Sequence, residues 1–163
     1  DVLELQDVLR EALRVTAPYL AARRLTVEPT FPTTPVLFYG DRVRLLQAFG
    51  SLLDHAVRWG SEGSRVTIEL ASVVAVEWRI VVTHDVAGQQ ADFARALDTF
   101  SRLGGRMEEP LGLGLRVAKE IVELHHGRLW VEGEPGRSSR LVITLPAVQQ
   151  QEPSARHDAS SNA

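Results

Sequence analysis

The sequence predicts an α+β two-layer sandwich, with three main helices on one face of a mixed, mostly antiparallel sheet of about five strands. Two observations lead to this fold class. Apolar residues recur at helical spacing in three separate segments, and apolar and polar residues alternate in the segments between and after them. The predicted order is α-β-α-β-β-α-β-β. A chain of 163 residues that is 44% hydrophobic and 24% charged is large enough for one domain with its own core.

The first predicted helix covers residues 4 to 24, where apolar side chains are spaced as on one helical face. Pro18 lies inside this segment, and we expect it to bend or break the helix because proline has no N–H to donate. Arg23 and Arg24 are expected to form a solvated charge pair at the helix end. A short strand over 25–28 follows, and three prolines then mark a loop.

Asp41 is a favourable N-cap for the second helix. The expected apolar face of this helix consists of Val43, Leu46, Phe49, Leu53 and Ala56. Residues 66–70 and 78–82 both alternate between apolar and polar side chains. These two segments predict adjacent antiparallel strands.

Residues 84–111 have little periodicity apart from a short predicted helix over 93–100, and a segment of this kind is typical of a functional lid. Apolar positions from Leu115 to His125 then predict the third long helix, with the His125 ring in a structural role and His126 in an exposed turn. Two strands over 129–131 and 141–145 complete the sheet. We therefore expect one domain over residues 1–147 and a disordered polar tail over 148–163.

Composition excludes several classes of site and partner. The chain has no cysteine, so it has neither disulfides nor thiolate metal sites. Its formal charge of −3 argues against a general nucleic-acid binder. No apolar run approaches the roughly 20 residues that span a bilayer. We expect cytoplasmic residence, with no membrane contact from this segment.

A pair of glycines opens the third helix, in the segment Gly112-Leu113-Gly114-Leu115. The first N–H groups of a helix have no partner within the helix, and the helix dipole is positive at this end. These N–H groups are therefore candidates to hold phosphate. A plain loop-to-helix junction is the alternative interpretation.

Several motifs occur in a fixed order along the chain. They are 41–47 followed by 51–58, then Phe100-Ser101-Arg102, then 112–115, and finally 123–127 with 136–146. Taken together they resemble the ATP-binding catalytic domain of sensor histidine kinases, which belongs to a superfamily with gyrase, a heat-shock chaperone family and MutL. The resemblance covers residues 2 to 146, which is nearly all of the predicted domain. It implies the same α/β sandwich and an ATP site formed by these motifs.

The segment 51–58 departs from the family's N box, which has asparagine at two positions. Ser51 replaces the first asparagine and His55 replaces the second. In the family, the second asparagine binds the magnesium that bridges the phosphates. His55 therefore stands at a metal-ligand position, but Mg²⁺ prefers oxygen ligands. A histidinium at this position could contact phosphate instead, or the residue could have no role in binding.

The first glycine box of the family, Asp-x-Gly-x-Gly, is also altered. Following the strand alternation, His84 takes the place of the aspartate and Gly88 that of the second glycine, while a shift by one residue would put Asp85 in the aspartate position. The family aspartate accepts a hydrogen bond from the adenine amino group. Leaving that amino group unpaired would cost about 1–3 kcal/mol, which is about ten- to a hundredfold in affinity. Either residue could still contact a purine, and the alternative is a polar strand end without a ligand.

Arg58 and Arg102 are the remaining candidates for contacts to phosphate, because a guanidinium matches phosphate geometry. A solvated helix face is the alternative for both. The candidate nucleotide-binding set is therefore Ser51, His55, Arg58, His84, Asp85, Gly88, Arg102, Gly112, Leu113, Gly114 and Leu115.

The resemblance implies a catalytic domain of a two-component sensor histidine kinase, with weak ATP binding that depends little on Mg²⁺. Its partners would be the dimerisation and phospho-acceptor domain of the same parent protein and the receiver domain of a response regulator. No acceptor-histidine helical hairpin is evident in this sequence, so no catalytic residue is assigned to it. The alternative is a pseudokinase domain that serves as a signalling or docking module without ATP turnover.

Overall fold

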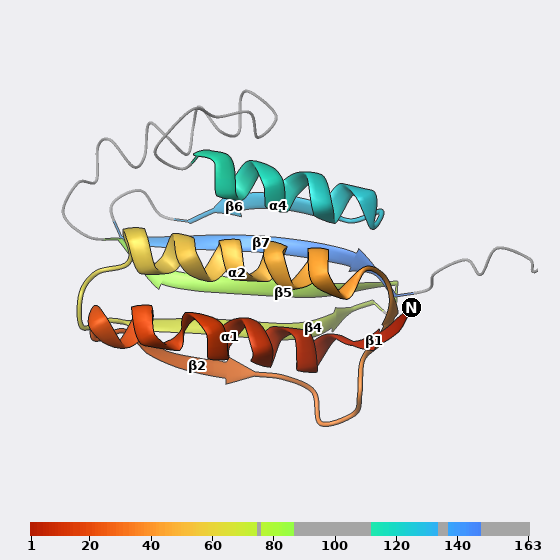
Figure 1. The fold of residues 1–163 in the computed structure, drawn as a ribbon, viewed down its shortest axis with the longest axis horizontal. Helices are drawn as coiled ribbons and strands as arrows, with labels where there is room; N and C mark the ends of the chain where they lie inside the picture. The colour runs from red at the N-terminus through yellow and green to blue at the C-terminus, as the bar shows by residue number, and fades with distance from the viewer. Residues whose placement is uncertain (75, 87–111, 134–136, 148–163) are drawn as a thin grey trace, which may run out of the picture.

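The computed structural model describes residues 1–74, 76–86, 112–133 and 137–147, which form two layers (Figure 1). The helices of this part are α1 (Leu5–Ala22), α2 (Arg42–Trp59) and α4 (Gly112–Leu124). The strands are β1 (Val2–Glu4), β2 (Thr26–Thr30), β3 (Leu37–Tyr39), β4 (Arg65–Val73), β5 (Glu77–Asp85), β6 (Arg128–Glu132) and β7 (Ser138–Pro146). The predicted helix over 93–100 and the predicted tail over 148–163 lie outside the described residues.

The main sheet confirms the predicted fold class. Its five strands have the order β2-β4-β5-β7-β6. The edge strand β2 pairs with β4 in parallel, and all other pairs are antiparallel, including the predicted pair β4 and β5. Helices α1, α2 and α4 run across one face of this sheet, so the molecule is a two-layer sandwich (Figure 1).

The alternation of side chains along the strands determines which side chains face the helices. Ile68 on β4 is paired with Val82 on β5, and Val82 is paired with Leu141 on β7. All three side chains are buried in the core with the apolar faces of the helices. His84 lies two residues after Val82, so it points to the same helix-covered side and is buried there.

Helix α1 continues through Pro18, so the predicted break does not occur. Pro18 lies on the exposed side of the helix, one turn before its end. The carbonyl that would have accepted the missing N–H can therefore be hydrated, and the cost of the proline is reduced.

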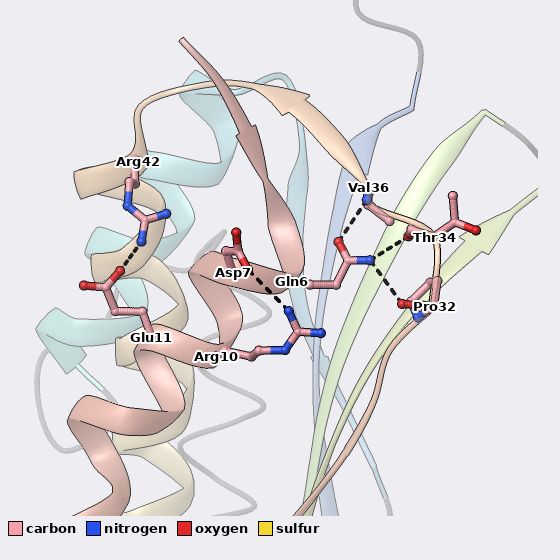
Figure 2. A network of polar contacts seen from close by, with 8 residues as sticks. All are labelled: Gln6, Asp7, Arg10, Glu11, Pro32, Thr34, Val36 and Arg42. Atoms are coloured by element: carbon pink, nitrogen blue, oxygen red, sulfur yellow. Dashed lines mark hydrogen bonds and ion pairs between the residues drawn. The ribbon is translucent and has the colours of Figure 1, made fainter.

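One buried polar side chain of α1 bonds to the loop between β2 and β3. Gln6 is fully buried, and its amide oxygen accepts a hydrogen bond from the Val36 N–H at 2.9 Å. Its amide nitrogen donates to the carbonyls of Pro32 and Thr34 at 3.2 and 2.7 Å (Figure 2). Because the amide bonds on both sides, its burial is compensated and the loop after β2 is held against α1.

Two further features differ from the prediction. Strands β1 and β3 form a separate two-stranded sheet that the sequence pattern did not indicate, because three-residue strands are too short to show alternation. Val43 is 75% exposed, although it was expected on the apolar face of α2. The buried stripe of α2 runs through Leu45 and Phe49, and two residues correspond to about 200° around a helix. Val43 therefore lies opposite the core.

None of the helices in the described part of the chain is long and apolar enough to cross a membrane.

Candidate functional site

The candidate site lies at the edge of the molecule where β5 ends, α2 approaches its last turn and α4 begins (Figure 1). Asp41 caps α2 as predicted, because its carboxylate accepts from the Arg44 N–H at 3.1 Å. From this start, α2 carries Ser51, His55 and Arg58 toward that edge. The alternation of β5 brings His84 to it from the sheet side.

The structure brings two of the predicted residues into direct contact. His55 Nδ1 lies 3.3 Å from His84 Nε2, and the ring centroids are 5.4 Å apart. His55 is 5% exposed and His84 is 1% exposed. The two histidines that were predicted at the metal and adenine positions are thus one buried pair of imidazoles.

The partners of His84 determine where the protons of the neutral pair lie. His84 Nδ1 is 3.1 Å from the Asp85 carbonyl oxygen, which can only accept, so the His84 proton is on Nδ1. His84 Nε2 then has a lone pair, and His55 donates to it from Nδ1. His55 consequently carries its lone pair on Nε2.

Burial keeps both rings in the neutral form. It lowers the pKa of His55 well below the ordinary value, and the pKa is lowered further by the charge that His84 carries when protonated and by the Arg58 guanidinium. Burial also lowers the pKa of His84, although the hydrogen bond to the Asp85 carbonyl and the Asp85 carboxylate favour its charged form. At neutral pH, the His55–His84 pair therefore carries no formal charge.

Asp85 and Val86 are placed differently from His84. The Asp85 side chain is exposed, and its carbonyl accepts from the Ser61 N–H at 3.0 Å. Val86 is buried, pairs with Gly60 and donates its N–H to the Arg137 carbonyl at 3.0 Å. The strand direction therefore continues through Val86, and His84 occupies the inward position of this segment.

Ser51 and Arg58 lie on either side of His55 along α2. The Ser51 hydroxyl donates to the Gln47 carbonyl one turn earlier, at 2.9 Å. Arg58 is exposed and forms an ion pair with Asp54 at 3.7 Å. A pair of this kind on a helix surface contributes little to stability, so the guanidinium can be redirected at small cost.

Helix α4 begins at Gly112, in agreement with the predicted start, and its N-terminus lies at the same edge as the end of β5 and the last turn of α2 (Figure 1). A Cβ added to Gly114 would meet no atom of the described residues within 4 Å. Among these residues the surface over Gly114 is therefore open, whereas Leu115 is buried in the core. Of the four predicted residues, Leu115 has a packing role in addition to its N–H. The side chain of Leu113, together with Gly88 and Arg102, lies outside what the structure describes.

Helix α2 is held at its C-terminal end by a residue that was expected to be solvated. Arg23 donates to the carbonyls of Val57 and Arg58, and to that of Gly60 at 2.9 Å. These are the carbonyls that have no partner within the helix, so the cation satisfies them and interacts favourably with the helix dipole. The expectation of a solvated Arg23 was wrong, because its partners are backbone atoms far along the chain.

The other end of α2 is held by His125, which has the structural role predicted for it. Its Nε2 accepts from the Asp41 N–H at 3.0 Å, and its Nδ1 donates to the Ile121 carbonyl at 2.8 Å. His126 is exposed with φ at 62°, and its N–H and that of Gly127 close the end of α4 by bonding to Glu123 and Val122. His126 is thus the exposed turn residue that the sequence predicted.

Comparison with known proteins now decides the family. The family of histidine kinase-, DNA gyrase B- and HSP90-like ATPases matches residues 40–149. The chain belongs to this family. It is 28% identical over 146 residues to the alginate biosynthesis sensor protein KinB of Pseudomonas aeruginosa, and 36% identical over 114 residues to the sensor protein DivL of Caulobacter vibrioides. Within the family, it is a catalytic ATP-binding domain of the sensor histidine kinase type.

Solved structures agree with this ATPase fold. The mycobacterial sensor histidine kinase MprB is 26% identical, with a TM-score of 0.69 over 90% of this chain and 96% of the MprB chain. The catalytic domain of the histidine kinase ThkA shares the fold, with a TM-score of 0.74 over 91% of this chain and 98% of that domain, at 17% identity.

This chain spans only part of its full-length relatives. The match covers 88% of this chain but 24% of KinB, and 70% of this chain but 14% of DivL. The relatives are therefore larger proteins in which this domain is one part.

Proposed function

We propose that this chain supplies the ATP-binding catalytic domain of a two-component sensor histidine kinase, with ATP binding that is weak and depends little on magnesium. The observation that carries the proposal is the contact of His55 with His84 at 3.3 Å inside the fold. It replaces, with two neutral imidazoles, the residues that the family uses for metal and adenine. The family membership of the chain supports the first half of the proposal, and the imidazole pair supports the second.

The adenine end of the site loses its anionic acceptor. Both nitrogens of His84 already bond within the protein, one with the Asp85 carbonyl and one with His55. An adenine amino group at this position would therefore find no free carboxylate on the inward side of β5. The expected loss is about 1–3 kcal/mol, or about ten- to a hundredfold in affinity.

The magnesium end does not fit the ion. Mg²⁺ takes oxygen ligands in near-octahedral geometry, whereas His55 offers nitrogen. Among the described residues, no group of three or more histidine, aspartate or glutamate side chains is arranged to hold a metal. The described residues at this end of the site therefore do not fit a magnesium ion.

The phosphate end is retained. The N-terminus of α4 begins at Gly112, and the open surface over Gly114 leaves room for phosphate oxygens near the first N–H groups. Arg58 can leave its exposed pair with Asp54 and contribute a guanidinium. Phosphoryl transfer depends mainly on positioning and charge stabilisation. In this proposal, the domain would position the γ-phosphate toward a histidine on the phospho-acceptor domain of the parent protein.

Titration calorimetry with ATP, with and without Mg²⁺, tests the proposal. The double variant His55→Asn/His84→Asp restores the family's residue types and is expected to bind ATP about ten- to a hundredfold more tightly, with a clear dependence on magnesium. His126→Asn is the matched control, because His126 is exposed and asparagine tolerates its positive φ. Tight, magnesium-dependent binding by the wild-type chain would show that the proposed weakness is wrong.

A second function is favoured by the same pair. If the double variant gains no affinity, the chain is better described as a pseudokinase domain that docks a response regulator without ATP turnover. Phosphorylation of a separately supplied acceptor domain distinguishes the two. The kinase proposal expects slow transfer that the double variant accelerates, and the pseudokinase proposal expects none from either protein.

A further inference from the structure

We propose that His55 and His84 form a binding site for a divalent transition-metal ion of the zinc class. This inference does not depend on nucleotide binding. Neutral imidazole nitrogens are preferred ligands for zinc and neighbouring transition metals and poor ligands for magnesium. The two rings are buried side by side, and His55 Nδ1 faces His84 Nε2.

The separation of the two nitrogens matches such an ion. Zinc binds imidazole nitrogen at about 2.0–2.1 Å with tetrahedral angles, which places two ligand nitrogens about 3.3 Å apart. His55 Nδ1 and His84 Nε2 are 3.3 Å apart. Because the observed separation equals the expected one, the two nitrogens need little change in position to hold an ion between them.

His84 already has the surroundings of a metal ligand. Its Nδ1–H donates to the Asp85 carbonyl, which fixes the ring and leaves Nε2 as the coordinating atom. A metal-bound histidine generally makes this second bond to a carbonyl or carboxylate. On metal binding, the Nδ1 proton of His55 moves to its Nε2. One N–H···N hydrogen bond is then replaced by two nitrogen–metal bonds, without net loss of a proton.

A third donor lies beside the pair. Ser139 on β7 is the cross-strand partner of His84 and shares its side of the sheet. It is fully buried, and its hydroxyl has no hydrogen-bond partner among the residues that the structure describes. Because catalytic zinc sites usually have three protein ligands, we expect Ser139 or water to complete the coordination and the affinity to be modest.

Calorimetric titration of the metal-free chain with zinc chloride at pH 7.5 tests the site. Wild type and the control His126→Asn are expected to bind one zinc ion per chain with equal affinity at the pair. His55→Gln and His84→Gln should each bind zinc at least about tenfold more weakly, since each removes one ligand. Equal affinity in all four proteins, or no zinc binding by the wild type, would overturn the proposal. The titration contains no nucleotide, so its result is separate from that of the ATP experiment.

A second measurement needs no variant. In nitrogen-15 NMR spectra of the histidine side chains, zinc should shift His55 Nδ1 and His84 Nε2 and leave the nitrogens of His125 unchanged. If zinc shifts only His126 or His157, the ion binds away from the pair and the proposed site is wrong.

Discussion

Two histidine sites in this molecule differ in the kind of partner to which their ring nitrogens bond. His125, at the end of α4, bonds through both ring nitrogens to backbone atoms, and its ring lies 6.1 Å from that of Phe38. The His55–His84 pair, at the other end of α2, depends on a bond between two side chains. Backbone partners belong to the fold itself, whereas a bond between side chains exists only while both residues are present.

The difference separates a structural histidine from the pair that we propose as part of a binding site. His125 connects the end of α4 to the start of α2, and a Cβ added to Gly40 would come within 2.9 Å of its ring. The close packing shows that this histidine is part of the helix layer. Under the proposed function, replacement of His55 and His84 should alter binding more than topology.

The largest expected effect is that of His125→Ala. The variant loses two hydrogen bonds to the backbone and the packing of the ring, and the free energy of unfolding should fall by about 2–3 kcal/mol. Urea unfolding followed by circular dichroism measures this change. His126→Asn serves as the control and should stay within about 0.5 kcal/mol of wild type. A loss of less than about 0.5 kcal/mol in His125→Ala would remove the contrast between the two sites.

A smaller effect is expected at the pair. His84→Leu alone leaves His55 Nδ1 buried without the acceptor it now has, which should cost about 1–3 kcal/mol. Adding His55→Leu removes both polar partners, and the double variant should recover most of that loss. Urea unfolding of the two single variants and the double variant gives the coupling energy. Simple additivity of the single losses would contradict a bond between these side chains.

The smallest expected effect is a pH dependence of stability. Because the native pKa values of His55 and His84 are lowered, the unfolded chain binds protons more readily as the pH falls through about 6.5. Their contribution to stability is complete above that pH and decreases below it. Between pH 7.5 and 6.0 the loss is at most about 0.8 kcal/mol for each histidine.

Unfolding curves at the two pH values check this expectation. The His55→Leu/His84→Leu variant is the matched control, and it should lose less stability between pH 7.5 and 6.0 than wild type. An equal loss in both proteins would assign the pH dependence to other groups.

The predictions that succeeded rest on patterns within short segments. Alternation and helical spacing predicted the three helices and the five strands of the main sheet. The same patterns place His55 on the buried face of α2 and His84 on the buried face of β5, so they are compatible with a contact between the two residues. The sequence alone does not give the distance between α2 and β5, so the bond itself required the structure.

The predictions that failed concern contacts between distant segments. Arg23 bonds to carbonyls 34 to 37 residues away, and a backbone acceptor leaves no mark in the sequence. Gln6 bonds to the loop after β2 for the same reason and was not singled out. Pro18 was expected to bend or break α1, and the break does not occur because its position on the exposed side of the helix reduces its cost.

The anchoring of α2 has a consequence for how the domain could respond to a ligand. His125 holds the first residues of this helix, and Arg23 from the end of α1 holds its last carbonyls. Because α2 is hydrogen-bonded at both ends, it cannot tilt or slide without losing those bonds. The same bonds join the start of α2 to the end of α4 and the end of α2 to the end of α1. Distances measured between spectroscopic labels at these two junctions should therefore stay constant on ligand addition.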